Sequence, residues 1–203
     1  MVKIAFHEIL FAETWEKEDT LDQVNLIESE EPSFKVKFGD FFCAVQGLDY
    51  FAAMLYAEKN FEAAIQSDST LYNFIIKLHK ISAKHLLLLS PGQEGGASGE
   101  LAKIQPKIRN ENGSLQETPT KLEDIQNSFQ KFCADLQEKI SFIANPMSAV
   151  RCAAFALGSL GKIHPFINGN GRTARILMNC ILVHGQSVAI NFDNKNVYYN
   201  ACR

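Results

Sequence analysis

The chain has 203 residues, of which 46% are hydrophobic and 21% charged, and this composition suits one domain with a sizeable core. Its formal net charge of -3 argues against a nucleic-acid-binding protein that works through bulk positive charge. The five cysteines are odd in number and lack Cys-x-x-Cys spacing, which indicates buried thiols in a reducing compartment. No apolar run is long enough to span a membrane, and the first residues turn acidic too early for a signal peptide. We therefore expect a cytoplasmic protein with neither a membrane nor a nucleic-acid partner.

The first 48 residues carry weak patterns. Residues 28–32 are acidic and are expected to form a solvated loop, and residues 33–38 alternate apolar and polar side chains as a half-buried strand does. We interpret residues 1–48 as an N-terminal extension that packs on the domain.

Helical patterns begin after residue 48. A helix is expected over 49–59, because apolar side chains recur there at spacings of three and four, and another over 71–85. Residues 67–70 offer N-cap candidates for the second helix. Its two histidines, His79 and His85, are six residues apart, which is not a metal-ligand spacing on one helix face. We expect both to be structural histidines with satisfied partners.

A loop and a short hairpin are expected next. Residues 90–99 contain four glycines and one proline, so they must form a loop. Residues 100–109 alternate around Pro106 and are followed by the turn sequence Asn-Glu-Asn-Gly at 110–113, which predicts a hairpin with an edge-type strand.

Two further helices follow. Residues 121–143 have helical apolar spacing, Asn145 and Pro146 should end that helix, and Ser148 is a candidate cap for the next. Residues 149–163 are rich in alanine, which permits close helix contact and favours a central position. Pro165 should stop this helix directly after His164.

The most informative stretch is 164–175, which reads H-P-F-I-N-G-N-G-R-T-A-R. Glycines at 169 and 171 allow a tight turn that presents bare N–H groups, and the apolar spacing of 173–183 predicts a helix directly after it. Such a loop at a helix N-terminus binds phosphate, and Arg172 and Arg175 could extend the site. His164 could take a proton from an attacking hydroxyl. The pattern is typical of a nucleotide-using transferase.

This stretch resembles the signature of the Fic (Fido) family, H-P-F-x-[D/E]-G-N-G-R-x-x-R, and departs from it only at Asn168, where the family has an acidic residue. The resemblance implies a mainly α fold, a Fic-type helical bundle with a short β-hairpin flap over the active site. The Fic domain would occupy 49–203 and be either minimal or cut short at its C-terminal end. A cytoplasmic protein, or an effector delivered into a host cell, would both fit.

The activity that the resemblance implies is transfer of AMP from ATP to a Ser, Thr or Tyr hydroxyl of a target protein. His164 would be the general base, and Phe166 a buried anchor of the loop. Asn168, Gly169, Asn170 and Gly171 would lie at the phosphates, with Arg172 at the β-phosphate and Arg175 at the γ-phosphate, or else in a structural ion pair. By strand addition, the flap would align the target hydroxyl through Gly99, Glu100, Leu101, Ala102, Lys103 and Ile104. Family flaps often carry an arginine where this chain has Glu100 and Leu101, and an ordinary surface hairpin is the alternative interpretation.

Asn168 stands where the family ligand for Mg²⁺ would be, and it offers only a neutral carbonyl oxygen. The alternatives are an attenuated AMP transferase with a weak metal site, a transferase of another phosphate-containing donor such as phosphocholine or a phosphoryl group, and a catalytically silent binding module. Family members often carry an inhibitory helix with the pattern S/T-x-x-x-E-G/N. Its only literal match, at 90–95, contains Pro91 and Gly92 and should not be helical. An antitoxin-like partner, or a segment beyond Arg203, would then supply the inhibitory glutamate.

Overall fold

The protein is described by a computed structural model that covers residues 32–85, 95–109 and 114–190, with side chains from residue 45 onward except that of Arg109. The described part of the chain contains helices and one small antiparallel sheet. In chain order these are α2 (Pro32–Ala64), α3 (Asp68–Ser82), β1 (Lys107–Arg109), β2 (Leu115–Glu117), the 3-10 turn η3 (Leu122–Asp124), α4 (Ile125–Ser141), α5 (Pro146–Ile163) and α6 (Asn170–His184). The predicted mainly α fold with a short hairpin is confirmed.

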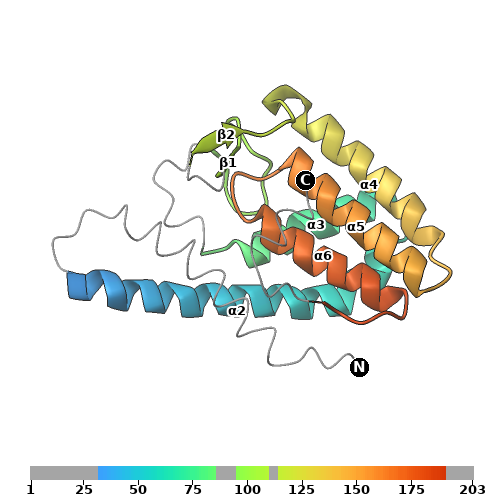
Figure 1. Ribbon diagram of the computed structural model, residues 1–203, viewed down its shortest axis with the longest axis horizontal. Helices are drawn as coiled ribbons and strands as arrows, with labels where there is room; N and C mark the ends of the chain where they lie inside the picture. The colour runs from blue at the N-terminus through green and yellow to red at the C-terminus, as the bar shows by residue number, and fades with distance from the viewer. Residues whose placement is uncertain (1–31, 86–94, 110–113, 191–203) are drawn as a thin grey trace.

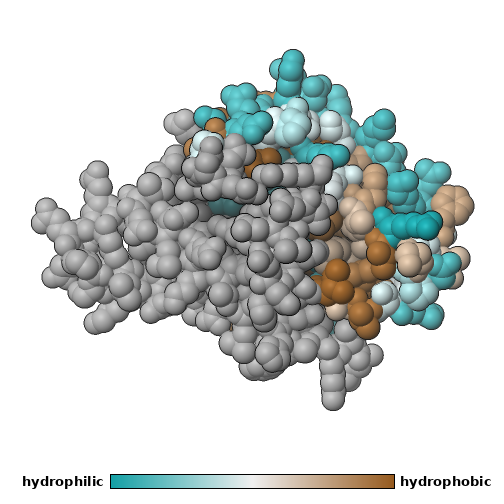
Figure 2. Space-filling model, viewed as in Figure 1, coloured by the Kyte–Doolittle hydropathy of each residue, from teal (hydrophilic) through white to brown (hydrophobic). Residues whose placement is uncertain are grey.

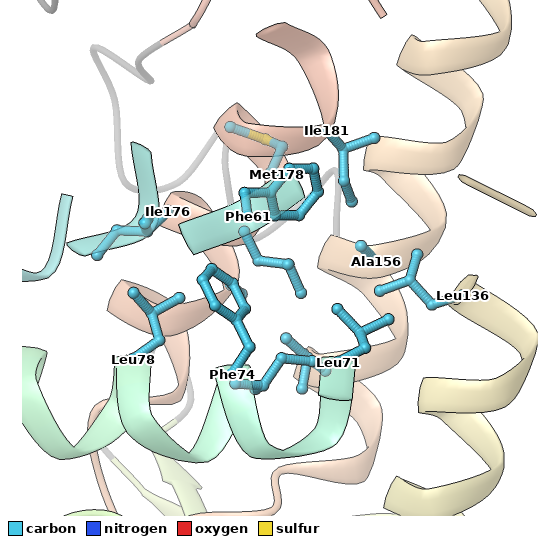
Figure 3. Close-up of a cluster of buried hydrophobic side chains, with 14 of the residues drawn as sticks. Phe61, Leu71, Phe74, Leu78, Leu136, Ala156, Ile176, Met178 and Ile181 are labelled. Atoms are coloured by element: carbon cyan, nitrogen blue, oxygen red, sulfur yellow. The ribbon is translucent and has the colours of Figure 1, made fainter. Parts of the chain in front are cut away.

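The helices form a bundle in which α2 runs along one side, while α5 and α6 lie next to each other and are joined by the loop that follows His164 (Figure 1). The core lies between them. It draws buried apolar side chains from each of the five described α-helices, including Phe61, Leu71, Phe74, Leu78, Leu136, Ala156, Ile176, Met178 and Ile181 (Figure 3). Burial of these side chains is what fixes α6, and so the loop before it, in the bundle.

Local capping sets the helix starts. The Ser67 side chain accepts a hydrogen bond from the Thr70 N–H, and the Thr70 hydroxyl returns to the Ser67 N–H, forming a capping box for α3. Asn145 does the same for α5, accepting from the Ser148 N–H at 2.9 Å. The sequence had favoured Ser148 as this cap, which is wrong: Ser148 completes the box from inside the helix, and Pro146 occupies the first turn, where its missing N–H costs nothing.

The strand predicted for 33–38 is also wrong, because these residues lie in the first turns of α2. Alternation over six residues is a short signal, and no proline interrupts the chain between Pro32 and the end of α2. A continuous helix satisfies its backbone hydrogen bonds internally, so it extends back to Pro32. The helix predicted for 71–85 is α3, which starts earlier and ends at Ser82.

The hairpin is shorter than the alternation suggested. β1 pairs with β2 in the register Lys107 with Glu117, Ile108 with Gln116 and Arg109 with Leu115, and the predicted turn at 110–113 lies outside the described residues. Residues 100–106 form a loop, because two of their N–H groups bond elsewhere: Ala102 to the Pro165 carbonyl at 2.9 Å and Lys103 to the Gly95 carbonyl at 2.8 Å. These bonds draw the loop toward the end of α5.

On the face seen in Figure 2, hydrophilic side chains cover most of the described outer rim, and a hydrophobic group lies beside the grey atoms. Large apolar side chains are also exposed where α4 joins α5, at Phe142, Met147 and Val150. Among the described helices, none has the length and hydropathy that a membrane span would require.

Candidate active site

His164 caps the C-terminal end of α5. Its backbone adopts the left-handed conformation with φ 51° and ψ 56°, and its N–H donates to the Leu160 carbonyl at 2.9 Å. This conformation is uncommon for a residue with a side chain and often marks functional sites. It turns the chain out of α5 and directly into the loop that opens α6.

The His164 imidazole is half-buried, and its Nδ1 is buried without a hydrogen-bond partner among the described residues. Burial lowers the pKa of His164 below its ordinary value of 6.5, while the nearby Gly161 carbonyl acts in the opposite direction. The ring is therefore neutral at neutral pH. A neutral imidazole can accept a proton, which is what a general base requires.

The side chain of Asn170 holds the loop in shape. Its Oδ1 accepts from the Phe166 N–H at 3.0 Å, and its Nδ2 donates to the Phe166 carbonyl at 2.7 Å. Gly169 adopts φ 78°, and its carbonyl accepts both the N–H and the hydroxyl of Thr173. Asn170 thus closes the loop with its side chain, and its backbone N–H remains at the start of α6.

Helix α6 begins at Asn170, and N–H groups in the first turn of a helix have no acceptor within the helix. Together with the helix dipole they favour an anion at this end. The Gly169 N–H differs, because it donates to Asn168 Oδ1 at 2.7 Å. Of the predicted anion-binding N–H groups, those of Asn170 and Gly171 lie in the first turn of α6, and that of Gly169 already has a partner.

The side-chain and backbone oxygens of Asn168 both accept hydrogen bonds. Its Oδ1 accepts from the Gly169 N–H, and its backbone carbonyl accepts from the His79 ring at 2.9 Å. Within the described residues, no group of three His, Cys, Asp or Glu side chains could hold a metal ion. A single neutral oxygen that already has a donor does not fit the preference of Mg²⁺ for anionic oxygen ligands.

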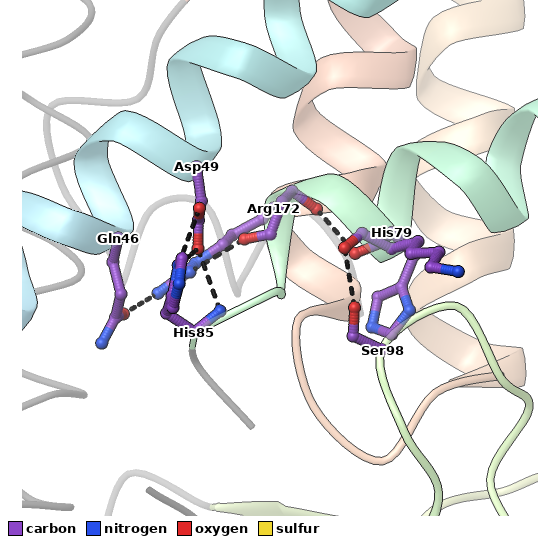
Figure 4. Close-up of polar contacts among 8 residues, drawn as sticks. Gln46, Asp49, His79, His85, Ser98 and Arg172 are labelled. Carbon is purple, nitrogen blue, oxygen red and sulfur yellow. Dashed lines mark hydrogen bonds and ion pairs between the residues drawn. The ribbon is translucent and has the colours of Figure 1, made fainter. Parts of the chain in front are cut away.

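Arg172 points into the fold. The residue is 2% exposed, its Nη1 donates to the Ser82 carbonyl at 3.1 Å, and its Nη2 donates to Gln46 Oε1 of α2 (Figure 4). Arg175 is half-buried one turn further along α6. The predicted roles of Arg172 and Arg175 at the β- and γ-phosphates stay predictions.

The predicted flap residues lie beside the loop. The Ala102 N–H reaches the Pro165 carbonyl, and the Gly99 N–H donates to His79 Nδ1 at 2.9 Å. Glu100 and Lys103 form an exposed ion pair of 2.7 Å. From the sequence, residues 99–104 and 164–175 could be assigned to one site only through the family resemblance. The hydrogen bonds of Ala102 and Gly99 show that the two segments are neighbours in the fold.

Both histidines expected to be structural have partners. His79 is fully buried in α3, and its two ring nitrogens contact Gly99 and Asn168. His85 lies beyond the end of α3, where its Nδ1 pairs with Asp49 at 2.8 Å. The expectation is confirmed, but the sequence did not reveal that His79 contacts both loops of the candidate site.

Sequence reasoning also missed Gln46. Its side chain is fully buried and holds Arg172, although its Nε2 has no partner among the described residues. A weak signal existed, since Gln46-Gly47 matches the last two positions of the inhibitory pattern with Gln for Glu. Phe42 stands where that pattern has Ser or Thr, which hid the match.

The buried ring of His79 makes stability depend on pH. Burial, the largest cause, lowers the pKa of His79 from 6.5 to about 4; the Asn168 contact opposes this, and the charge of Arg172 lowers it further. Between these values the unfolded chain binds a proton that the folded protein does not. The free energy of unfolding should therefore fall by on the order of 3 kcal/mol as the pH drops from 6.5 to 4.

Urea denaturation at pH 7 and pH 4.5 would measure this effect. His79→Gln removes the titrating group, so its free energy of unfolding should depend less on pH than that of the parent. His164, whose pKa is also lowered, contributes with the same sign in both proteins. Parallel pH dependences in parent and variant would contradict this account of His79.

Known proteins resemble the chain in sequence. The sequence model of the Fic/DOC family matches residues 69–182. "Protein adenylyltransferase Fic" of Aedes aegypti is 31% identical over 158 residues, which cover 77% of this chain and 28% of that protein. The protein of the same name in Nematostella vectensis is 39% identical over 83 residues, covering 40% and 19%. The chain thus spans less than a third of either curated relative.

Solved structures resemble the fold. A Fic-domain-containing signalling protein from Bacteroides thetaiotaomicron aligns with a TM-score of 0.56 at 17% identity, over 98% of this chain and 75% of that one. Fic-1 (residues 134–508) from C. elegans aligns at 0.50 and 16%, over 89% and 49%. The family match covers more than half of the chain and includes the loop built above, and the fold agrees with it. The chain belongs to the Fic/DOC family.

Proposed function

We propose that this protein transfers AMP from ATP to a Ser, Thr or Tyr hydroxyl of a target protein. The observation that carries the proposal is the position of His164, a neutral imidazole that leads directly into the N-terminus of α6. A proton acceptor beside an anion-binding helix end is the arrangement that nucleotidyl transfer to a hydroxyl needs. The names of the two relatives, both protein adenylyltransferases, support the same activity.

In this reaction His164 takes the hydroxyl proton, and the hydroxyl oxygen attacks the α-phosphorus of ATP. The bond between that phosphorus and the bridging oxygen breaks, and pyrophosphate leaves with the electron pair. The first-turn N–H groups of Asn170 and Gly171, with the α6 dipole, stabilise the negative charge on the phosphates. Residues 99–104 bring the target segment to the loop, since Ala102 is bonded to Pro165.

Arg172 and Arg175 are the arginines of α6, and in this proposal they contact the distal phosphates. Arg172 is 2% exposed and is held by Gln46 and the Ser82 carbonyl, so in this proposal it reaches a β-phosphate by giving up the Gln46 contact. A charged phosphate oxygen is a stronger acceptor than a neutral amide oxygen. We therefore propose that nucleotide binding draws the Arg172 guanidinium away from α2.

Transfer can be tested with ATP labelled either at the α-phosphate or at the γ-phosphate, incubated with the purified protein and a cell lysate. AMP transfer predicts protein-bound label only from the α-labelled nucleotide. Label from γ-labelled ATP would identify phosphoryl transfer instead. Absence of label with both, although ATP binds in calorimetry, would identify a nucleotide-binding module without turnover, the alternative that the neutral oxygen of Asn168 favours.

Asn168→Asp should increase Mg²⁺-dependent transfer by on the order of tenfold. One carboxylate oxygen can keep the Gly169 N–H that Asn168 now accepts, and the other becomes an anionic ligand of the kind that Mg²⁺ prefers. Rates at increasing Mg²⁺ concentration would show the change as a lower half-saturating concentration.

Asn168→Ala is the matched control for the Asp substitution. It removes the oxygen that accepts from Gly169 without adding charge, so it should not gain Mg²⁺ dependence. If Asn168→Asp has the same Mg²⁺ dependence as the parent, residue 168 does not limit the metal site, and an attenuated AMP transferase with a weak metal site at Asn168 is ruled out.

A further inference from the structure

His79 contacts both loops of the candidate site with a single buried ring. Its Nδ1 lies 2.9 Å from the Gly99 N, its Nε2 lies 2.9 Å from the Asn168 carbonyl, and its plane stacks on Phe166 at 3.7 Å between ring centroids and 4° between planes. Figure 4 shows the ring between α3 and the segment that carries Ser98. The contacts join residues that are 20 and 89 positions away along the chain.

The two contacts fix the tautomer of the ring. A backbone N–H can only donate and a carbonyl can only accept, so Nδ1 is the unprotonated acceptor and Nε2 carries the proton. Both nitrogens are thereby used, and neither is left for proton transfer to a substrate. His79 is therefore not itself a base. Its ring instead holds the Gly99 N–H and the Asn168 carbonyl at a set distance from each other.

Both loops approach α3 through glycines in the left-handed conformation. Gly99 has φ 84°, and a Cβ there would lie 2.8 Å from the Lys80 Cβ; Gly169 has φ 78°, and a Cβ there would lie 3.2 Å from His79 Nε2. A side chain at either position would push its loop away from α3. The Ser98 hydroxyl adds a third anchor by donating to the Lys80 carbonyl at 2.7 Å.

We propose that His79 is a positioning residue that couples nucleotide binding at the 164–175 loop to the placement of the target-aligning segment 99–104. This inference rests on the proposed function. An anion at the α6 N-terminus favours one arrangement of Asn168, and the rigid ring transmits that arrangement to Gly99. Coupling between two sites is reciprocal, so a target held by the segment also strengthens nucleotide binding by the same factor.

A second connection runs through the backbone, from the Ala102 N–H to the Pro165 carbonyl. It bypasses His79 and serves as an internal reference. If His79 carries the coupling, its replacement should free Gly99 while Ala102 stays protected.

Two substitutions separate the functions of the ring. The Nδ1 of histidine is two bonds from Cβ, like the amide atoms of asparagine, and Nε2 is three bonds from Cβ, like those of glutamine. His79→Asn can keep an acceptor for Gly99 and loses the donor to Asn168. His79→Gln can keep the donor to Asn168 and loses the acceptor for Gly99.

The experiment measures amide hydrogen exchange of Gly99 and Ala102 by NMR, with and without a non-hydrolysable ATP analogue, alongside calorimetric affinity for the analogue. In the parent protein the analogue should slow exchange at Gly99. His79→Gln should abolish that slowing, keep the protection of Ala102 and bind the analogue within about twofold of the parent. His79→Asn should weaken analogue binding by about two- to tenfold, the loss of one hydrogen bond, and keep Gly99 protected.

The two variants should also differ in their KM values. His79→Gln should have a higher KM for the target, and His79→Asn should have a higher KM for ATP. If both variants lose activity and protection in parallel with their unfolded fraction, the role of His79 is purely structural and the inference is wrong. The parent alone provides a measurement that needs no variant: exchange of the His79 Nε2 proton should slow when the analogue binds. An unchanged rate of that proton would also overturn the inference.

The proposed function and the coupling through His79 can be contradicted separately. A parent protein that shows the exchange pattern but transfers no AMP would contradict the proposed function and leave the coupling standing. The coupling alone would be contradicted if the parent transfers AMP but the two His79 variants do not differ in amide exchange of Gly99 and in affinity for the ATP analogue.

Discussion

Replacing His164 by alanine should lower the rate of AMP transfer by about 10²- to 10⁴-fold, the usual contribution of a general base. Burial lowers the pKa of the His164 imidazole, so in the parent protein the neutral ring can accept the hydroxyl proton at neutral pH. Alanine cannot accept a proton. The first-turn N–H groups of α6 are unchanged, so ATP affinity should be nearly that of the parent.

Transfer to lysate proteins and ATP calorimetry, measured on the same preparation, would separate the two effects. His184→Ala is the matched control, because His184 lies at the other end of α6 and pairs with Glu62 at 2.9 Å. The control should retain the parent rate. A fully active His164→Ala variant would rule out the role of His164 as general base.

Gly169→Ala should destabilise the protein by about 2–4 kcal/mol, from roughly 1 kcal/mol of left-handed backbone strain and about 1–3 kcal/mol of overpacking. Gly169 has φ 78°, and a Cβ there would lie 2.9 Å from the Ala83 Cβ and 3.2 Å from His79 Nε2. Ala83 is fully buried at the end of α3, so it has little room to move. The loop should shift, and nucleotide binding should weaken with it.

Urea denaturation compares this variant with Gly158→Ala, in which the same substitution is made within α5. A Cβ at Gly158 meets nothing within 4 Å, and alanine is the better helix former by about 1 kcal/mol. The control should therefore be slightly more stable than the parent. Equal stability of both variants would contradict the close approach of Gly169 to α3.

Much of the fold could be predicted because its helices, caps and turns depend on residues that are close together in the sequence. The helical spacings, the Ser67 cap and the glycines at the start of α6 each act over a few residues, and the structure confirms them. Local signals also explain the errors. The alternation at 33–38 is too short a signal to outweigh continuation of the helix. Ser148 resembles an N-cap in sequence because both members of a capping box favour helix starts.

The rest of the site depends on contacts between distant residues. Arg172 contacts Gln46 and the Ser82 carbonyl, which are 126 and 90 positions away in the sequence. His79 contacts Asn168, which is 89 positions away. No periodicity in the sequence encodes such pairs, because they depend on how α2, α3 and α6 pack. The motif predicted which residues gather at the α6 N-terminus, and only the packing showed that Arg172 lies buried against α2.

Transfer of AMP with His164 as the general base is tested by mass spectrometry of a target protein after incubation with this protein and ATP. We predict AMP joined by a phosphodiester bond to a Ser, Thr or Tyr side chain, and no such adduct when His164→Ala replaces the parent. A phosphoryl or phosphocholine adduct, or an AMP adduct that forms equally well with His164→Ala, would contradict this prediction.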